Sequence, residues 1–354
     1  MPMKGYVLQG ANVAEWRDDL PIPEPDLGEI LIKPVVVAPC TSDVHILETM
    51  AFPTLKGRPL GHEVAGVVAA VGPGVLHFKE GDRVAVPSAI VNWANPMIQE
   101  GYDKYDQLSS YFLTDPRLGG CFAEYFLVKD GDMNVALIPD GVSWEQAVVC
   151  TDMGTTGFEA VNWLHLKYGQ SVVVYGIGAV GLMAICAAVL KGAGRIFGVG
   201  SRPVCFDVAR RYGATDLVNY RDGDVSDQIM ELNGGPVDTA VVCGGSDISA
   251  LAEAVQMVRQ GGYITNAAVF MHDTEFVLPN ASWMYGTGDK TIRGIGTRGG
   301  RAFLERLMTL AQYGRFQPEL IVTHTFHGME HIPEALAMMG GQVREAIKPV
   351  VFFD

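Results

Sequence analysis

The sequence of 354 residues has little positive charge, no membrane-length apolar run and no closely paired cysteines. Its formal net charge of −14 argues against non-specific nucleic-acid binding, because neutralising phosphates requires a basic face. The longest apolar run, Ala179 to Leu190, is too short to span a bilayer, and the first residues contain no apolar core of signal-peptide length. The six cysteines form no C-x-x-C motif, which suggests reduced thiols. We therefore expect a cytoplasmic protein that binds neither nucleic acid nor membrane.

The order of apolar patterns along the chain predicts two domains. Up to about Cys150, short apolar runs broken by glycine and proline are typical of an antiparallel or mixed β domain. From Ser171 onward, six β-runs alternate with helical periods, which specifies a doubly wound parallel sheet. The last apolar segment, "KPVVFF", is expected to rejoin the first domain. We predict an α/β protein with a β-rich domain at 1–152 and 299–354 and a nucleotide-binding domain at 153–298.

A glycine-rich loop carries the signal for a dinucleotide. The stretch "VVVYGIGAVG" contains G-x-G-x-x-G directly after a predicted strand and at the start of a predicted helix. Such glycines permit a tight turn, a close approach of backbone to pyrophosphate and close helix–strand packing, and the amides at the helix N-terminus face the phosphates. The predicted loop comprises Gly176, Ile177, Gly178, Ala179, Val180 and Gly181.

The second strand of the parallel sheet ends without the acidic residue that usually binds the ribose 2′-hydroxyl of NAD. The sequence there is "GVGSRP", so Gly200 removes a carboxylate that would repel a 2′-phosphate. Ser201 can donate a hydrogen bond, and Arg202 offers a planar fork for phosphate oxygens. Tyr220, at the end of the next predicted strand, could flank the adenosine. These residues favour NADP(H) over NAD, although a surface arginine beside a turn-forming proline is the plainer explanation of Arg202.

Candidate metal ligands lie in three short segments. "PCTSDVH" supplies Cys40, "GHE" supplies His62 and Glu63, and "CTDMG" supplies Asp152. A thiolate, an imidazole and a carboxylate together form a zinc site with one open position, as Lewis-acid catalysis requires. Spacing alone does not establish such a site, because a cysteine and a histidine this far apart are more often a core thiol and a structural histidine.

Several motifs together resemble a known family over nearly the full chain. They are "PCTSDVH", "GHEVAGVVAAVG", "GDRVAVP", "TDMGTTGF", "GIGAVGLM", "GVGSRP" and "GATDLVNY". With them the chain resembles the zinc-dependent medium-chain alcohol dehydrogenases, and within that family the tetrameric NADP-dependent secondary alcohol dehydrogenases of bacteria. The resemblance implies a GroES-like catalytic domain, a Rossmann domain and a homotetramer. It also implies a small alcohol or ketone as substrate, with secondary alcohols and ketones interconverted and primary alcohols and aldehydes as further candidates.

The resemblance also implies roles for individual residues. Cys40, His62 and Asp152 would hold one catalytic zinc ion, with Glu63 as a supplementary ligand. Asp43 would orient the imidazole of His62. Ser42 would hydrogen-bond the substrate oxygen and pass its proton towards His45, although a serine in a "TSD" turn is more often a helix cap.

Two departures from the broader family are visible in the sequence. The segment 87–120 contains no cysteine, so we expect no structural Cys₄ zinc there and stabilisation instead by the aromatic residues Trp93, Tyr102, Tyr105 and Tyr111. The resemblance places the substrate pocket at Ser88, Ala89, Tyr111, Val269 and Gly296. The last two side chains are smaller than the aromatic residue and the leucine of relatives, which predicts room for a larger substrate.

Two other functions are weighed against the leading hypothesis of an NADP(H)-dependent zinc oxidoreductase. A zinc-free reductase of activated double bonds, acting on quinones or enones, belongs to the same superfamily but lacks the Cys/His/Asp set. A non-catalytic NADP-binding protein would need neither those ligands nor Ser42 and His45.

Overall fold

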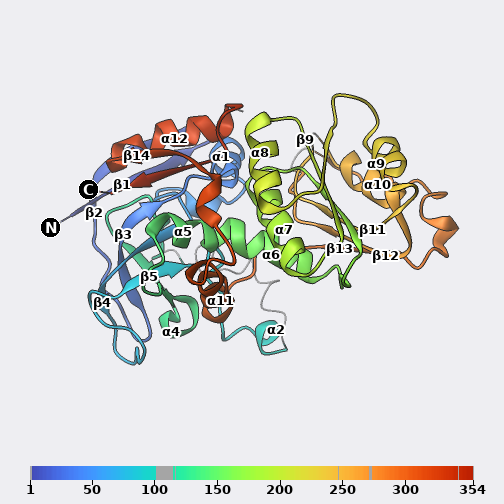
Figure 1. Cartoon of the computed structure of the whole chain (residues 1–354). Helices are drawn as coiled ribbons and strands as arrows, with labels where there is room; N and C mark the ends of the chain where they lie inside the picture. Colours follow the sequence, from blue (N-terminus) through green and yellow to red (C-terminus); the bar gives the residue numbers. More distant parts are fainter. Residues whose placement is uncertain are drawn as a thin grey trace. The chain divides into compact units, whose positions relative to one another are not determined.

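A computed structural model describes residues 2–100, 115, 117–245, 247–270, 273–341 and 343–353 (Figure 1). The chain forms two compact units: Met1–Thr155 with Thr297–Asp354, hereafter the first unit, and Thr156–Gly296, the second unit. The chain therefore leaves the first unit once and returns to it. Within the described ranges, no helix has the length and apolar composition needed to cross a membrane.

The first unit is built on a β-sheet with strand order β14-β15-β3-β4-β5-β7, to which β6 adds by pairing with β3. The pairs are antiparallel except β14 with β15, which is parallel. The strand bounds are β3 Ile30–Val37, β4 Val64–Val71, β5 Arg83–Val86, β6 Phe126–Val128, β7 Ala136–Leu137, β14 Val322–His327 and β15 Lys348–Phe352. A separate antiparallel pair consists of β1 (Met3–Gly10) and β2 (Val13–Leu20).

The C-terminal strand returns to the first unit, as predicted. Val351 of β15 pairs with Val37 of β3, so the last strand continues a sheet begun some three hundred residues earlier. Both strands are largely buried, and Val351 lies in one core cluster with Phe122 and Ile332. The apolar run "KPVVF" thus forms a strand because this sheet buries it on both sides.

Helices of the first unit are mostly short. They are α1 Thr41–Thr49, α2 Pro96–Gln99, α4 Gly131–Asn134, α5 Trp144–Val149, α11 Arg301–Gln312 and α12 Ile332–Gly340, with the 3₁₀ turns η1 Pro53–Leu55, η6 Pro318–Ile321 and η7 Met329–His331. Ser143 and Gln146 cap α5 reciprocally, since each side chain accepts a hydrogen bond from the other's backbone amide. This helix widens directly into a π-helical turn, η4 (Cys150–Gly154), and α6 (Thr155–Asn162) follows without a break.

The second unit is a doubly wound parallel sheet, which confirms the fold predicted for this part of the chain. Its strand order is β10-β9-β8-β11-β12-β13, and every pair is parallel. The strands are β8 Ser171–Tyr175, β9 Arg195–Gly200, β10 Asp216–Asn219, β11 Val237–Val242, β12 Val258–Asn266 and β13 Thr291–Gly294. The helices are α7 Ala179–Leu190, α8 Pro203–Tyr212, α9 Val225–Asn233 and α10 Ser249–Met257, with the 3₁₀ turn η5 Met284–Gly286.

Strand β12 begins at Val258, immediately after α10. Val237 pairs with Val258, and the register shifts before Thr239 pairs with Tyr263. Gly261 and Gly262 lie within this irregularity.

The strand order reverses between β8 and β11, and such a switch point is where open α/β sheets bind ligands. Gly176 follows β8 with a φ of 85°, and a Cβ atom there would lie 2.6 Å from the backbone nitrogen of Gly244, beyond β11. A Cβ atom on Gly181 would lie 2.2 Å from the carbonyl oxygen of Gly176. Both glycines are therefore required by the close approach of backbone segments at the switch point.

Candidate active site

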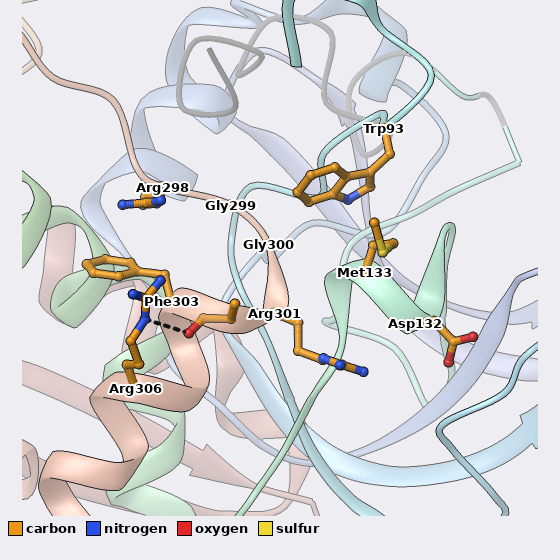
Figure 2. Close-up of a pocket in the computed structure, with 10 residues that line it drawn as sticks. Trp93, Asp132, Met133, Arg298, Gly299, Gly300, Arg301, Phe303 and Arg306 are labelled. Atoms are coloured by element: carbon orange, nitrogen blue, oxygen red, sulfur yellow. Dashed lines mark hydrogen bonds between the residues drawn. The ribbon is translucent and has the colours of Figure 1, made fainter. Parts of the chain in front are cut away.

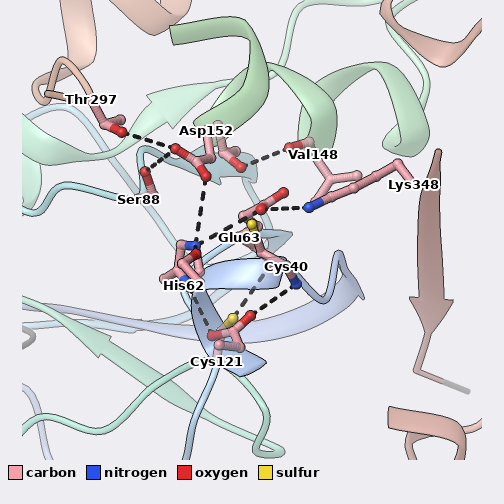
Figure 3. A network of polar contacts seen from close by, with 12 residues as sticks. Cys40, His62, Glu63, Ser88, Cys121, Val148, Asp152, Thr297 and Lys348 are labelled. Carbon is pink, nitrogen blue, oxygen red and sulfur yellow. Dashed lines mark hydrogen bonds and ion pairs between the residues drawn. The ribbon is translucent and has the colours of Figure 1, made fainter. Parts of the chain in front are cut away.

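Four potential metal ligands meet in the first unit (Figure 3). One ligand atom from each of Cys40, His62, Glu63 and Asp152 lies within 4.8 Å of those of the other three. We call this group the donor cluster. Cys40 precedes α1, His62 and Glu63 precede β4, and Asp152 lies in the π-helical turn η4. The cluster therefore combines residues from three elements that the sheet of the first unit holds together.

Asp43 fixes two members of the donor cluster at once. Its Oδ2 accepts a hydrogen bond from the backbone amide of Cys40 at 3.0 Å, which caps the first turn of α1. Its Oδ1 lies 2.9 Å from Nδ1 of His62. Because the carboxylate accepts the proton of Nδ1, Nε2 of the imidazole faces the cluster, and its lone pair can bind a metal ion that takes the place of the Nε2 proton. Asp43 thus orients the histidine as the sequence analysis expected, although its function stays a prediction.

The π-helical turn presents the carboxylate of Asp152. Thr151 donates its hydroxyl to the carbonyl of Val148, and Thr155 donates to the carbonyls of Thr151 and Asp152. These side-chain bonds add to the backbone hydrogen bonds that the same carbonyls accept, and so fix the geometry of the turn. Asp152 Oδ2 lies 3.6 Å from Nε2 of His62, while Oδ1 accepts hydrogen bonds from two hydroxyl groups, those of Ser88 and Thr297, at 3.0 Å each.

Glu63 is buried against a lysine that the sequence analysis did not single out. Nζ of Lys348 lies 2.6 Å from Oε1 of Glu63, and both side chains are fully buried. The other carboxylate oxygen of Glu63, Oε2, is buried and has no hydrogen-bond partner in the part of the chain that the structure describes. A buried carboxylate oxygen without a donor is costly. A cation within the donor cluster would satisfy it, so the residues present fit a metal ion.

The surrounding charges shift the pKa values of the cluster. Burial raises the pKa of the Cys40 thiol, but the positive charge of Lys348 and the hydrogen bond with His62 outweigh it, and the pKa is lowered to about 7. Burial lowers the pKa of His62, whereas Asp43 and Asp152 raise it well above its ordinary value. Burial raises the pKa of Asp152, but its hydrogen bond to His62 lowers it overall. A thiol that ionises near neutral pH is suited to metal ligation.

Formal charges within the site balance around a divalent ion. The Glu63 carboxylate and the Lys348 ammonium compensate each other. The thiolate of Cys40 and the carboxylate of Asp152 would then balance two positive charges, with neutral His62 as a third ligand. Sulfur, nitrogen and oxygen donors in this number are typical of a catalytic zinc site with an open position.

Ser42 and His45 lie three residues apart on α1, a spacing that puts two side chains on one helix face. Oγ of Ser42 lies 3.1 Å from Nε2 of His62, beside the donor cluster. Nδ1 of His45 is buried without a hydrogen-bond partner, and its nearest charged neighbour is Glu48 Oε2 at 3.9 Å. No hydrogen bond joins Ser42 to His45 among the described residues, so a proton relay between them needs a third group.

The predicted nucleotide loop lies in the second unit between β8 and α7, with Gly178 as the residue that precedes the helix. The Cβ position of Gly178 is within 3.8 Å of one guanidinium nitrogen of Arg202, so the arginine head lies over the loop. Oγ of Ser201 donates to the hydroxyl of Tyr220 at 2.8 Å. The loop thus offers helix amides and a cation to an anionic ligand, which fits a dinucleotide phosphate.

Gly200 has a second role that the sequence analysis did not foresee. A Cβ atom at this position would lie 2.6 Å from Cγ1 of Ile177, so the absence of a side chain is a packing requirement as well as the absence of a charge. Replacing Gly200 with aspartate would test sterics and electrostatics together. Arg202 and Ser201 therefore offer the cleaner test of cofactor preference.

The grouping of the residues predicted for the substrate pocket stays a prediction. Tyr111, with Tyr102 and Tyr105, lies outside the described residues. Ser88 and Ala89 belong to the first unit and Val269 and Gly296 to the second, in which the Val269 side chain is 71% exposed. Ser88 was predicted as a lining residue, but its hydroxyl is bound to Asp152.

Figure 2 shows a separate cavity of about 240 Å³ at the start of α11. Trp93, predicted to contribute aromatic packing, is one of its walls and donates Nε1–H to Asn134 at 3.2 Å. Arg301 lies 3.3 Å from Glu305, and Nε of Arg306 donates to a backbone carbonyl of the same helix. None of the residues that line this cavity belongs to the donor cluster.

Comparison with known proteins identifies the family. The family described as "Alcohol dehydrogenase GroES-like domain" matches residues 26–140, and "Zinc-binding dehydrogenase" matches residues 179–312. NADP-dependent isopropanol dehydrogenases from Clostridium beijerinckii and Thermoanaerobacter brockii are each 41% identical to the chain, with 99% of both chains covered. The solved alcohol dehydrogenase of Thermus sp. ATN1 superposes with a TM-score of 0.86 at 26% identity, over 99% of this chain and 100% of the other.

The chain belongs to the zinc-binding alcohol dehydrogenase family. It is therefore an oxidoreductase with a GroES-like domain, which corresponds to the β-rich first unit, and a Rossmann-type parallel sheet. The donor cluster is the group in this alcohol dehydrogenase that could hold the family's metal.

Sequence reasoning missed three residues around the metal site of this alcohol dehydrogenase. Lys348 is separated from Glu63 by 285 positions, and Thr297 from Asp152 by 145. Cys121 donates its thiol to the carbonyl of Glu63 at 3.5 Å. Of these three residues, only Lys348 could have been found from the sequence. It stands at the start of the apolar run "KPVVFF", so it is a cation in a strand that is expected to be buried.

Replacing Lys348 with methionine should leave Glu63 buried without its cation. We expect the free energy of unfolding of the metal-free protein to fall by about 3–5 kcal/mol at pH 8, measured by urea denaturation. Burial already raises the pKa of Glu63, and removing the cation raises it further. The carboxyl can then be neutral at pH 5, so the loss should be smaller there.

The matched control is the double variant Lys348→Met with Glu63→Gln, which removes both charges and should recover much of the lost stability. A single variant as stable as the unchanged protein at pH 8 would contradict the assigned ion pair.

Proposed function

We propose that this chain is an NADP(H)-dependent zinc oxidoreductase that interconverts secondary alcohols and ketones. The observation that carries the proposal is the donor cluster itself, with a buried carboxylate oxygen that has no hydrogen-bond partner. Cys40, His62 and Asp152 would hold the zinc ion, and Glu63 is the supplementary ligand. When bound, zinc supplies Lewis acidity to a substrate oxygen, and the nicotinamide accepts or donates the hydride.

The chain's own residues then have distinct tasks. Asp43 holds the Nδ1 proton of His62, which keeps Nε2 directed at the metal. Ser42, whose hydroxyl lies 3.1 Å from that nitrogen, is close enough to the cluster to hydrogen-bond a substrate oxygen and take up its proton. His45, with a buried ring nitrogen that has no hydrogen-bond partner among the described residues, is the proposed next acceptor along α1, reached through a third group between it and Ser42.

Four observations support NADP(H) as the cofactor. The strand β9 ends at Gly200 without a carboxylate, and the guanidinium of Arg202 lies over the glycine loop. Ser201 and Tyr220 already share a hydrogen bond, so the two hydroxyls flank the same space. The isopropanol dehydrogenases from Clostridium beijerinckii and Thermoanaerobacter brockii, which match nearly the whole chain, are named NADP-dependent. An arginine flanked by neutral hydroxyl groups can donate charged hydrogen bonds to a 2′-phosphate, whereas an uncharged ribose gains little from the positive charge.

Three further parts of the proposal rest on the resemblance to relatives. The proposed substrates, secondary alcohols and ketones, follow from the names of the two isopropanol dehydrogenases. Primary alcohols are proposed as further substrates. A homotetramer is proposed as the assembly, which a light-scattering measurement of mass would test. The cytoplasm is proposed as the location, and the presence of all six cysteines as thiols is compatible with a reducing compartment.

The central experiment combines metal analysis with a cofactor assay. The purified protein should contain one zinc ion per chain and should oxidise NADPH when acetone is added. Asp152→Ala should lose zinc and activity together, because it removes a charged ligand. Asp132→Ala, at a carboxylate outside the cluster, is the matched control and should keep both. A fully active protein without metal would instead favour the zinc-free reductase.

Arg202→Ala should weaken NADPH binding selectively. A charged hydrogen bond contributes about 1.5–3 kcal/mol, so we expect the KM for NADPH to rise by about 10- to 100-fold while the KM for NADH changes little. Steady-state kinetics with both cofactors measure this difference. Arg210→Ala, on the exposed side of the following helix, is the control. Equal effects on both cofactors would rule out the assigned 2′-phosphate contact.

Substrate size provides a further test. We propose that Val269 and Gly296, which are smaller than the residues of relatives, leave room for a bulky substituent beside the reacting carbon. Turnover of a bulky aryl secondary alcohol should then be comparable to that of 2-butanol. A strong preference for 2-butanol would show that other side chains refill this space.

A further inference from the structure

The two oxygens of Asp152 have different surroundings (Figure 3). Oδ1 accepts hydrogen bonds from Oγ of Ser88 and Oγ1 of Thr297, each at 3.0 Å. Oδ2 lies on the other side of the carboxylate, 3.6 Å from Nε2 of His62 and within the donor cluster. We call Ser88 and Thr297 the hydroxyl clamp. Both clamp hydroxyls bind Oδ1, whereas Oδ2 lies towards His62.

The stereochemistry of a carboxylate makes this asymmetry consequential. Each carboxylate oxygen has two lone pairs in the plane of the group. Two hydroxyl donors on Oδ1 use both of its favourable acceptor directions, so a metal ion approaching Oδ1 would have to displace a hydroxyl. The same two bonds prevent rotation of the carboxylate about its bond to Cβ. The side chain therefore presents Oδ2 alone, in one orientation.

We propose that Ser88 and Thr297 are positioning residues that hold Asp152 as a one-oxygen ligand of the catalytic metal. The inference rests on the proposed zinc site. It assigns the clamp the task of keeping the coordination number low, because a carboxylate that binds through both oxygens would occupy the position that a substrate oxygen needs. Hydrogen-bond partners of metal ligands typically change metal affinity or activity by about 10- to 100-fold when they are removed.

The origin of the two clamp residues strengthens the argument. Ser88 follows β5, and its backbone amide also donates to the carbonyl of Thr151, next to Asp152 in the chain. Thr297 is the first residue of the chain after it returns to the first unit. Asp152 lies in the π-helical turn shortly before the chain leaves that unit. The clamp therefore connects Asp152, which lies shortly before the chain leaves the first unit, to Thr297, with which the chain returns. Neither clamp residue is a neighbour of Asp152 in sequence.

A purely structural role for the two hydroxyls predicts a different outcome from a positioning role. If they only satisfy a buried carboxylate, their removal should lower stability and leave the metal geometry unchanged. If they hold the carboxylate to one oxygen, their removal should change the coordination of a bound metal. A cobalt-substituted protein reports on this directly, because four-coordinate cobalt absorbs visible light more strongly than five-coordinate cobalt.

The test uses the full-length protein loaded with Co²⁺ or Zn²⁺, with Ser88→Ala and Thr297→Val alone and together. We expect the double variant to bind zinc about 10- to 100-fold more weakly in competition with a chelator, and its cobalt spectrum to lose intensity. Thr297→Ser keeps the hydroxyl and should retain both the affinity and the spectrum of the unchanged protein. Thr309→Val, which removes a hydroxyl bound within α11, is the control for a threonine far from the metal ligands.

The outcomes separate the inference from the function on which it rests. A double variant that folds, with unchanged zinc affinity and an unchanged cobalt spectrum, overturns the clamp. The same holds if Thr297→Ser behaves like Thr297→Val, since the hydroxyl would then be irrelevant. A protein whose metal affinity follows the prediction but that does not reduce acetone overturns the proposed function alone. A protein that binds neither metal overturns both.

Discussion

The stability of the first unit depends on how it accommodates several negative charges that are buried in a small volume. Glu63 and Asp152 are buried beside the thiol of Cys40, with Asp43 directly behind His62. Such a group is stable only with positive charge among it. Lys348 supplies one positive charge with its ammonium group. The other is supplied by a proton or a metal ion held by His62 and its neighbours. The candidate metal ligands are therefore also the buried charges that the fold must balance.

This constraint explains why distant parts of the chain meet where they do. Strand β15 carries Lys348 to the centre of the first unit, and its pairing with β3 makes the C-terminal segment part of the core. The same sheet holds β4, which follows His62 and Glu63, and β5, which precedes Ser88. The sheet thus acts as the frame on which ligands, counter-charge and clamp are arranged.

Local patterns were sufficient to predict what adjacent residues do, and insufficient for contacts that only the tertiary fold creates. The glycine loop and the alternation of strands with helices in the second unit are patterns of residues close together in the sequence, so the sequence carried them. The pairing of Glu63 with Lys348 spans 285 positions, and no periodicity or spacing encodes it. Ser88 illustrates the intermediate case: the resemblance predicted it in the substrate pocket, and the hydrogen bond of its hydroxyl to Asp152 was not foreseen.

The contact between Gly200 and Ile177 has a consequence for how cofactor preference could change during evolution or engineering. An acidic residue at position 200 requires the isoleucine side chain to move, because a Cβ atom there would lie 2.6 Å from its Cγ1. The effect of a substitution at position 200 therefore depends on the residue at position 177. A smaller residue at position 177 should make an acidic residue at position 200 easier to accommodate.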